Sequence, residues 1–420
     1  MKMNTPNNTT HSRSAFTVVE LLVVIVIAVL LLTIAVPAFQ STIYSSNRSL
    51  AVNALEASSI MARDAALNTG KDGAVVFVYD PEVQRVNIIP AIKVGTLRET
   101  STAPSGPGGG FASGFGDLPY FDRDVFVPAP VGQVLSIPDY WMVRGYAAPG
   151  MLLDIDSRGE EAATWFNSSM YGDDNVNIDL KREAHWVFPE TGFFPRNAQV
   201  NGGNLDGSLS TVNRDLPTAR QSFMIRFDAR TGAVSRDTRS ALFIDPRNSR
   251  ERIYGDQPNS NQQTLRVDLA ESLEVWATRV LSSPDVNGYG LAYGNDDEQL
   301  REQLIGTASN DTILVKPVSR VALYDERDLV LGIGARGLNT ETQSIYLPHD
   351  QNDRNVNIQF DTSLFDTSNE AEIVRRIDQW INGNTTYTTD NDLVIDFEDE
   401  PLSRLYLVQS YTGELKEVLR

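Results

Sequence analysis

Residues 15–39 read AFTVVELLVVIVIAVLLLTIAVPAF. From Leu21 to Val36 only Thr33 is polar, and Glu20 is the single charged residue of the stretch. A helix of this length and composition is long enough to cross a hydrocarbon core of about 30 Å. A charged side chain at bilayer depth costs roughly 2.5–3.5 kcal/mol or more, and such residues are functional candidates by default. The stretch therefore predicts a membrane-spanning helix in which Glu20 has a role that offsets this cost.

Charge indicates how the chain would be oriented. Lys2 and Arg13 precede the apolar stretch, whereas the whole chain has a formal net charge of −19. The positive-inside rule predicts a single-pass protein of the cytoplasmic membrane, with its N-terminus in the cytoplasm and its C-terminal body outside. So acidic a body is a poor nucleic-acid binder. The absence of cysteine excludes disulfides, thiolate metal sites and cysteine nucleophiles.

The helix is expected to continue beyond the membrane. The pattern predicts a helix over residues 16–68, with a transmembrane part at about 16–39 and an amphipathic part at about 40–68. Gly70 follows as a stop signal. Pro37 either kinks this helix or ends it at the membrane surface. The residues expected to pack on the body recur every three or four positions: Leu50, Ala54, Ala57, Met61 and Ala65.

Residues 15–25 resemble the prepilin N-terminal methylation motif of type IV pilins and pseudopilins. The resemblance implies that residues 1–15 are a leader, cut by prepilin peptidase between Ala15 and Phe16, and that Phe16 is then N-methylated. Glu20 and Pro37 are then the fifth and twenty-second mature residues, as in that family. Partners would be other pilins or pseudopilins, an inner-membrane assembly platform and the membrane itself. Ala15 departs from the usual glycine, which puts efficient cleavage in doubt.

Other interpretations of the N-terminal segment stay open. One is a plain signal anchor, and another is a secretory signal peptide cleaved after Ala38, although its apolar run is too long and contains an acid. If cleavage creates a Phe16 ammonium group, Glu20 of a neighbouring subunit can pair with it. Leaving one charge of such a pair alone costs about 3–5 kcal/mol, so the pair would set the register of an assembly. Glu20 could instead only extend to the membrane interface.

Residues 72–420 predict a β-rich extracytoplasmic domain. Three hairpins are expected, at residues 74–89, 222–234 and 405–419, with further strands at 273–281, 313–324 and 329–333. Helices are expected at 297–305 and 369–381. Residues 53–78, 223–232 and 410–414 resemble H-type minor pseudopilins of type II secretion. The expected fold class is α+β: a long helix on an antiparallel sheet or sandwich, with insertions at about 95–215 and 245–400.

No catalytic motif is recognisable, so an enzyme is not expected. His185 and His349 are interpreted as packed or surface residues. Alternating Asp173, Asn175, Asn177 and Asp179 are weak calcium candidates, as are the acids of residues 390–400, but solvated loops are favoured and no cofactor is expected. The leading hypothesis is a structural pseudopilin-like subunit of a type II secretion or type IV pilus-like assembly. The alternative is a membrane-anchored adhesin or ligand-binding protein, suggested by the size of the insertions.

Overall fold

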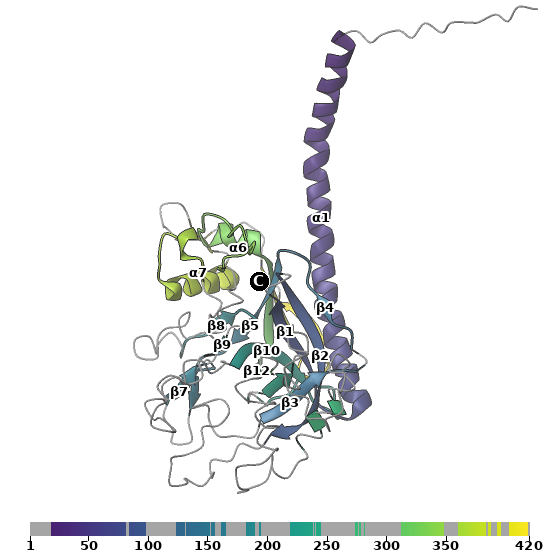
Figure 1. Cartoon of the computed structure of the whole chain (residues 1–420), viewed down its shortest axis with the longest axis vertical. Helices are drawn as coiled ribbons and strands as arrows, with labels where there is room; N and C mark the ends of the chain where they lie inside the picture. Colours follow the sequence, from purple (N-terminus) through teal and green to yellow (C-terminus); the bar gives the residue numbers. More distant parts are fainter. Residues whose placement is uncertain are drawn as a thin grey trace, which may run out of the picture. The chain divides into compact units, whose positions relative to one another are not determined.

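The structure is a computed structural model. The residues it describes are 18–80, 84–97, 123–130, 132–151, 153–155, 161–164, 182–189, 193–194, 219–237, 239, 241–244, 274–275, 277–278, 281, 312–347, 360–383, 385–387, 393–395 and 403–418. The chain divides into two compact units, Met1–Ser49 and Leu50–Arg420. One long apolar N-terminal helix and a sheet-rich domain make this an α+β protein (Figure 1).

The long helix α1 runs from Val18 to Thr69 and remains helical through Pro37. The alternative that Pro37 ends the helix is therefore wrong. Gly70 follows in the left-handed conformation with φ of 65°, and its N–H donates to the Ala66 carbonyl, as expected for a glycine that terminates a helix.

The second part of α1 packs on the domain through a different face from the one expected. Its buried residues are Ala51, Leu55, Ser58, Ser59, Ala62 and Ala66. Ser59 lies between two of the residues that were expected to pack, and each of the other buried residues directly follows one of them. Leu50, which was expected to pack, is 54% exposed. The reason is steric: Gly73 lies directly against the Ala62 backbone, so this face needs small side chains more than large apolar ones.

A ring of six strands forms the first sheet. The strands are β1 (Gly73–Asp80), β2 (Arg85–Leu97), β3 (Arg123–Pro128), β10 (Ala219–Phe227), β11 (Ala241–Ile244) and β12 (Thr312–Pro317). Their order is β1-β10-β12-β11-β3-β2, and β2 also pairs with β1, which closes the ring. The short strands β4 (Leu135–Ser136) and β9 (Phe193–Phe194) pair with β2 and β10.

The expected antiparallel sandwich is not confirmed, because this sheet is mixed. β10 pairs with β12 in parallel, and so does β11 with β3. Parallel neighbours need long crossover connections, which local sequence patterns do not reveal. The described strands within residues 95–215 and 245–400 include β3 and β12, so both ranges contribute strands to the ring.

Inward side chains fill the barrel. They alternate along each strand, as closed sheets require. The buried cluster consists of Ala74, Val76, Val78, Ile89, Ala91, Phe126, Met224, Ala241, Phe243, Ile313 and Val315.

A second sheet is antiparallel, in the order β17-β16-β13-β5-β8. Its strands are β5 (Trp141–Ala147), β8 (His185–Val187), β13 (Arg320–Asp325), β16 (Arg404–Val408) and β17 (Leu415–Val418). The chain passes from the barrel to this sheet at Val318, whose N–H donates to the Met224 carbonyl. The single strand expected at 313–324 is therefore two strands in two sheets. The sheets meet where Phe223 of β10 lies against Gly145 of β5.

The local expectations have mixed outcomes. The hairpins β1–β2 and β16–β17 are confirmed. The hairpin expected at 222–234 is confirmed in part, because β10 forms its first strand and the chain then turns back to an isolated antiparallel bridge between Phe227 and Val234. The returning segment forms no second strand, since β12 pairs with β10 up to Met224. Two short two-stranded sheets complete the described strands, β6 (Leu153–Ile155) with β7 (Glu161–Thr164) and β14 (Thr385–Tyr387) with β15 (Leu393–Ile395).

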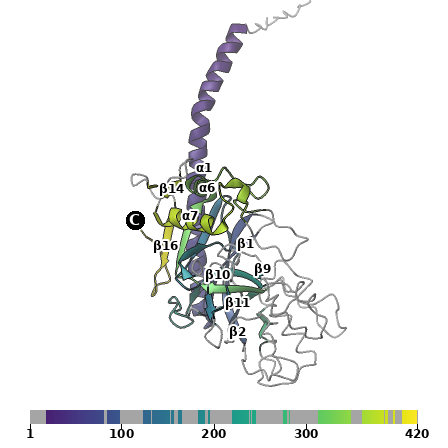
Figure 2. The same cartoon turned by 90° about the vertical axis from the view of Figure 1, so that its left-hand side faces the viewer.

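Two helices pack beside the second sheet, α6 (Glu326–Gly332) and α7 (Glu370–Gly383), with a 3-10 turn at Thr362–Leu364. They lie next to each other in both views (Figures 1 and 2). The helix expected at 369–381 is confirmed as α7. The strand expected at 329–333 is wrong, because the Asp325 side chain caps a helix there by accepting from the Arg327 N–H. The strand expected at 273–281 is also wrong, since its described residues are helical, and the helix expected at 297–305 lies outside the described residues.

Candidate functional site

The first candidate site is the apolar part of α1, within the unit Met1–Ser49. Its large apolar side chains, from Val18 to Phe39, are exposed. Among the described residues, α1 is the one helix long and apolar enough to span a membrane, and by length and composition it could also be a signal anchor. Glu20 stands in its first turn with an exposed side chain. An acidic residue there is favoured by the positive end of the helix dipole.

Pro37 interrupts the backbone hydrogen bonds inside this helix without ending it. A proline has no N–H to donate to the carbonyl four residues earlier, which here belongs to Thr33. The Thr33 hydroxyl donates to the Leu30 carbonyl at 2.7 Å, and the Thr42 hydroxyl donates to the Ala38 carbonyl at 2.9 Å. These local bonds give the helix side-chain donors on both sides of the proline.

Several residues singled out in the sequence lie outside the described residues. They are Ala15 and Phe16, the calcium candidates Asp173, Asn175, Asn177 and Asp179, and His349. Within the described part of the chain, no group of three or more His, Asp or Glu side chains could hold a metal ion. The calcium candidates therefore stay a prediction.

His185 is described and buried. Its Nδ1 lies 2.5 Å from Asp378 Oδ2, and Asp378 Oδ1 accepts from the Trp186 N–H at 2.7 Å. Trp186 Nε1 donates to Asn382 at 2.7 Å. Asp378 of α7 therefore connects this helix to His185 and Trp186 of β8.

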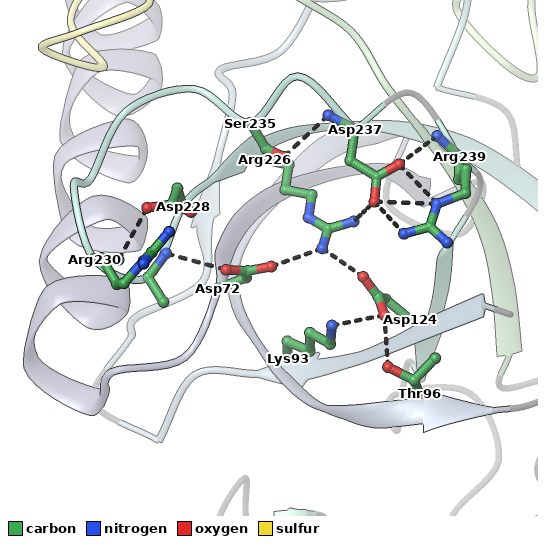
Figure 3. Close-up of polar contacts among 11 residues, drawn as sticks. Asp72, Lys93, Thr96, Asp124, Arg226, Asp228, Arg230, Ser235, Asp237 and Arg239 are labelled. Carbon is green, nitrogen blue, oxygen red and sulfur yellow. Dashed lines mark hydrogen bonds and ion pairs between the residues drawn. The ribbon is translucent and has the colours of Figure 1, made fainter.

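Sequence reasoning missed a charged layer at one end of the barrel, made of Asp72, Lys93, Asp124, Arg226 and Asp237 (Figure 3). Four of these residues stand two positions beyond an interior side chain of the barrel: Asp72 before Ala74, Lys93 after Ala91, Asp124 before Phe126 and Arg226 after Met224. Strand periodicity therefore turns their side chains toward the barrel axis.

Arg226 is the centre of this charged layer. One guanidinium nitrogen, Nη2, contacts Asp72 at 2.7 Å and also Asp124, while Nη1 contacts Asp237 at 3.2 Å. The guanidinium also lies over the Phe126 ring, 5.4 Å from its centroid. A planar group with several donors suits such a multiple contact.

Asp124 is held ionised by its partners. Lys93 Nζ lies 2.7 Å from Oδ1, and the Thr96 hydroxyl donates to the same oxygen at 2.8 Å. Burial would raise the pKa of this carboxyl group, but Lys93, Arg226 and Thr96 outweigh it and hold the pKa below its usual range. The charged layer therefore closes the barrel end with compensated charges.

The charged layer also connects the barrel to the turn after β10. Asp72 Oδ1 accepts from the Ala229 N–H at 3.0 Å, and Asp228 accepts from the N–H groups of Arg230 and Thr231. Asp237, beyond the turn, binds Arg239 as well as Arg226. The sequence signal that could have revealed this layer is a lone charge at an inward position at the end of an apolar strand.

This geometry defines a class: an α+β protein with one exposed apolar helix and a closed barrel whose end is sealed by paired charges. No family model, curated protein or solved structure matches the chain.

Proposed function

We propose that this protein is a structural, non-enzymatic subunit of a pilus-like assembly, related to the pseudopilins of type II secretion or the pilins of type IV pili. The observation that carries the proposal is the sequence around Phe16 and Glu20, followed by a helix whose apolar side chains from Val18 to Phe39 are exposed. Such a helix needs an apolar environment, which a membrane or neighbouring helices supply.

In this proposal the leader of residues 1–15 stays in the cytoplasm and prepilin peptidase cuts between Ala15 and Phe16. The body then stands outside the inner membrane, and Phe16 is N-methylated. The apolar helices of several subunits stack on an inner-membrane platform. Glu20 of one subunit pairs with the Phe16 amine of a neighbour, because an unpaired charge in that environment costs about 3–5 kcal/mol.

The charged layer takes no part in the proposed pairing of Glu20 with the Phe16 amine. It supports a structural role for the body, because its carboxylates are already compensated by Arg226 and Lys93. Charges paired in this way stabilise one arrangement of strands and leave little attraction for a further ion.

Mass analysis of the mature N-terminus tests the processing step. A chain beginning at a methylated Phe16 supports the proposal. A start at Phe39 identifies a secretory signal peptide, and an intact Met1 identifies a plain anchor. Ala15→Gly restores the residue usual in the family, so we expect it to increase the processed fraction.

Crosslinking tests the register. Glu20→Ala should leave membrane insertion intact and reduce crosslinking between copies or to partner subunits. Glu56→Ala, which removes another exposed acid of the same helix, is the matched control and should crosslink like the wild type. If processed Glu20→Ala protein crosslinks as the wild type does, Glu20 does not set the register of the assembly.

The second candidate is a membrane-anchored adhesin or ligand-binding protein, favoured by the length of the body after residue 72. It requires no pairing between Phe16 and Glu20. Surface exposure of an unassembled, unprocessed chain would favour it over a pilus-like subunit.

A further inference from the structure

Glu326 is a buried acid that neither the assembly helix nor the charged layer involves. It is the first residue of α6, directly after β13, and its side chain has no exposure. Its Oε1 accepts from the Ser344 hydroxyl at 3.2 Å and, at 3.5 Å, from the Ile345 N–H. Among the described residues, no donor reaches its Oε2. Two long contacts are weak support for a full negative charge.

The groups around Glu326 come from both sheets. Arg144 of β5 is the one nearby cation among the residues that influence it, and Asp325 is a neighbouring anion. Three phenols complete the set: Tyr79 of β1, Tyr324 of β13, and Tyr346 from the chain after α6. Glu326 therefore lies where the barrel, the second sheet and α6 meet.

Arg144 is already engaged by other partners. Its Nε donates to the Tyr324 hydroxyl at 2.8 Å, one Nη donates to the Tyr346 hydroxyl at 2.8 Å, and the other donates to the Trp186 carbonyl at 3.2 Å. The guanidinium also lies over the Phe188 ring, 5.2 Å from its centroid. These bonds direct the donors of Arg144 to neutral oxygens of the aromatic cluster.

We propose that the fold holds the Glu326 carboxyl group in its neutral, protonated form, because it is fully buried, has two long hydrogen bonds to Oε1 and, among the described residues, has no donor at Oε2. A neutral carboxyl group needs no compensating cation, whereas an isolated buried carboxylate is costly. When Glu326 ionises, the packing of α6 against β13 and α7 is weakened. The proposal does not depend on the proposed function.

The electrostatic balance agrees with this geometry. Burial raises the pKa of Glu326; Arg144, the Ile345 N–H and the Ser344 hydroxyl lower it, and the net shift is upward. Because the folded pKa is above the unfolded one, the unfolded chain loses its proton first as pH rises. Stability from this group is therefore complete at acidic pH, decreases above the ordinary glutamate pKa of about 4.3, and levels off above the raised pKa.

Urea unfolding of the full chain in detergent, repeated across a pH series, tests the proposal with Glu326→Gln. The variant cannot ionise, so its unfolding constant should fall relative to that of the wild type as pH rises above about 4.3, by up to tenfold per pH unit until the raised pKa is passed. Glu414→Gln, the same substitution at an exposed turn, is the control. A pH-independent difference for Glu326→Gln would overturn the proposal.

A measurement on the wild type covers the case in which Glu326→Gln does not fold. Amide hydrogen exchange should show that protection in α6, at Leu329, Val330 and the C-cap residue Ile333, decreases with rising pH relative to protection in β1. Equal pH dependence of protection in α6 and β1, after correction for intrinsic exchange, would contradict the proposal.

Discussion

Gly73, the first residue of β1, lies against the carbonyl oxygen of Ala62 in α1, with no room for a methyl group between them. The Ala66 methyl group is the next nearest neighbour of the same position. Backbone therefore meets backbone where the helix crosses the strand. This explains why the buried face of α1 consists mostly of alanine and serine.

Enlarging this face should separate helix and strand. Ala62→Leu adds a branched side chain where Ala62 is fully buried, and overpacking of this kind costs about 1–3 kcal/mol or more. Ala57→Leu makes the same change on the exposed side of the same helix and should stay within about 0.5 kcal/mol of the wild type. Urea unfolding of the two variants compares the faces directly. Equal stabilities would show that the helix does not pack here.

Removing the centre of the charged layer should destabilise the barrel. Arg226→Met removes the cation that Asp72, Asp124 and Asp237 share, so a loss of about 3–5 kcal/mol is expected. Arg239→Met removes an arginine that is 55% exposed and binds only Asp237 among the layer's acids, so it should cost about 0–1 kcal/mol.

A double variant separates charge compensation from packing at Arg226. Arg226→Met with Asp124→Asn removes both members of the buried pair, so it should recover part of the stability lost by Arg226→Met alone. Additive losses in thermal unfolding would show that the two residues are not coupled.

Acid should unfold the protein partly through Asp124. Its pKa is held below the usual range in the folded state, so it contributes stability above the ordinary aspartate pKa of about 3.9 and loses it as pH falls through the lowered value. Asp124→Asn should reduce stability near neutral pH and flatten the decrease on the acid side. An acid unfolding curve as steep as that of the wild type would contradict this role. Ionisation of Asp124 makes stability increase with pH, whereas the ionisation proposed for Glu326 makes it decrease, so one pH series can separate the two effects.

The contact between α6 and α7 should be equally intolerant of added volume. A side-chain atom on Gly332 would overlap the buried Trp380 indole ring. That ring lies edge-on to the Tyr324 ring, with 5.8 Å between the ring centroids. Gly332→Ala should therefore cost about 1–3 kcal/mol and change the fluorescence of Trp380. Leu331→Ala, next to it but 72% exposed, is the control and should change neither quantity appreciably.

Local patterns predicted those elements whose stabilising contacts are local. The hairpin β1–β2 brings Asp80 opposite Arg85, and α7 places Ile373, Ile377, Trp380 and Ile381 on one buried face. The pattern of residues 329–333 is ambiguous, because a short apolar run suits a strand or a helix equally well. Asp325 decides between them by capping the helix, a signal that is present in the sequence.

The charged layer shows what such patterns cannot supply. Arg226 meets Asp72 and Asp124, which lie more than a hundred residues earlier in the chain. Each is an ordinary charged residue in its own segment. Their significance arises only when strand order brings β1, β3 and β10 into one ring.

The sequence by itself determined the long apolar helix, its acidic residue Glu20 and the β-rich character of the body. Composition and short-range periodicity are enough for these features, because a helix and a hairpin close their hydrogen bonds within a few residues. Only the tertiary structure decided that the barrel closes with parallel neighbours, that α1 packs through its smallest side chains, and that Arg226 and Glu326 are buried in different electrostatic surroundings. Those outcomes depend on strand order, close packing and burial, which join residues far apart in the chain and leave no periodic trace in it.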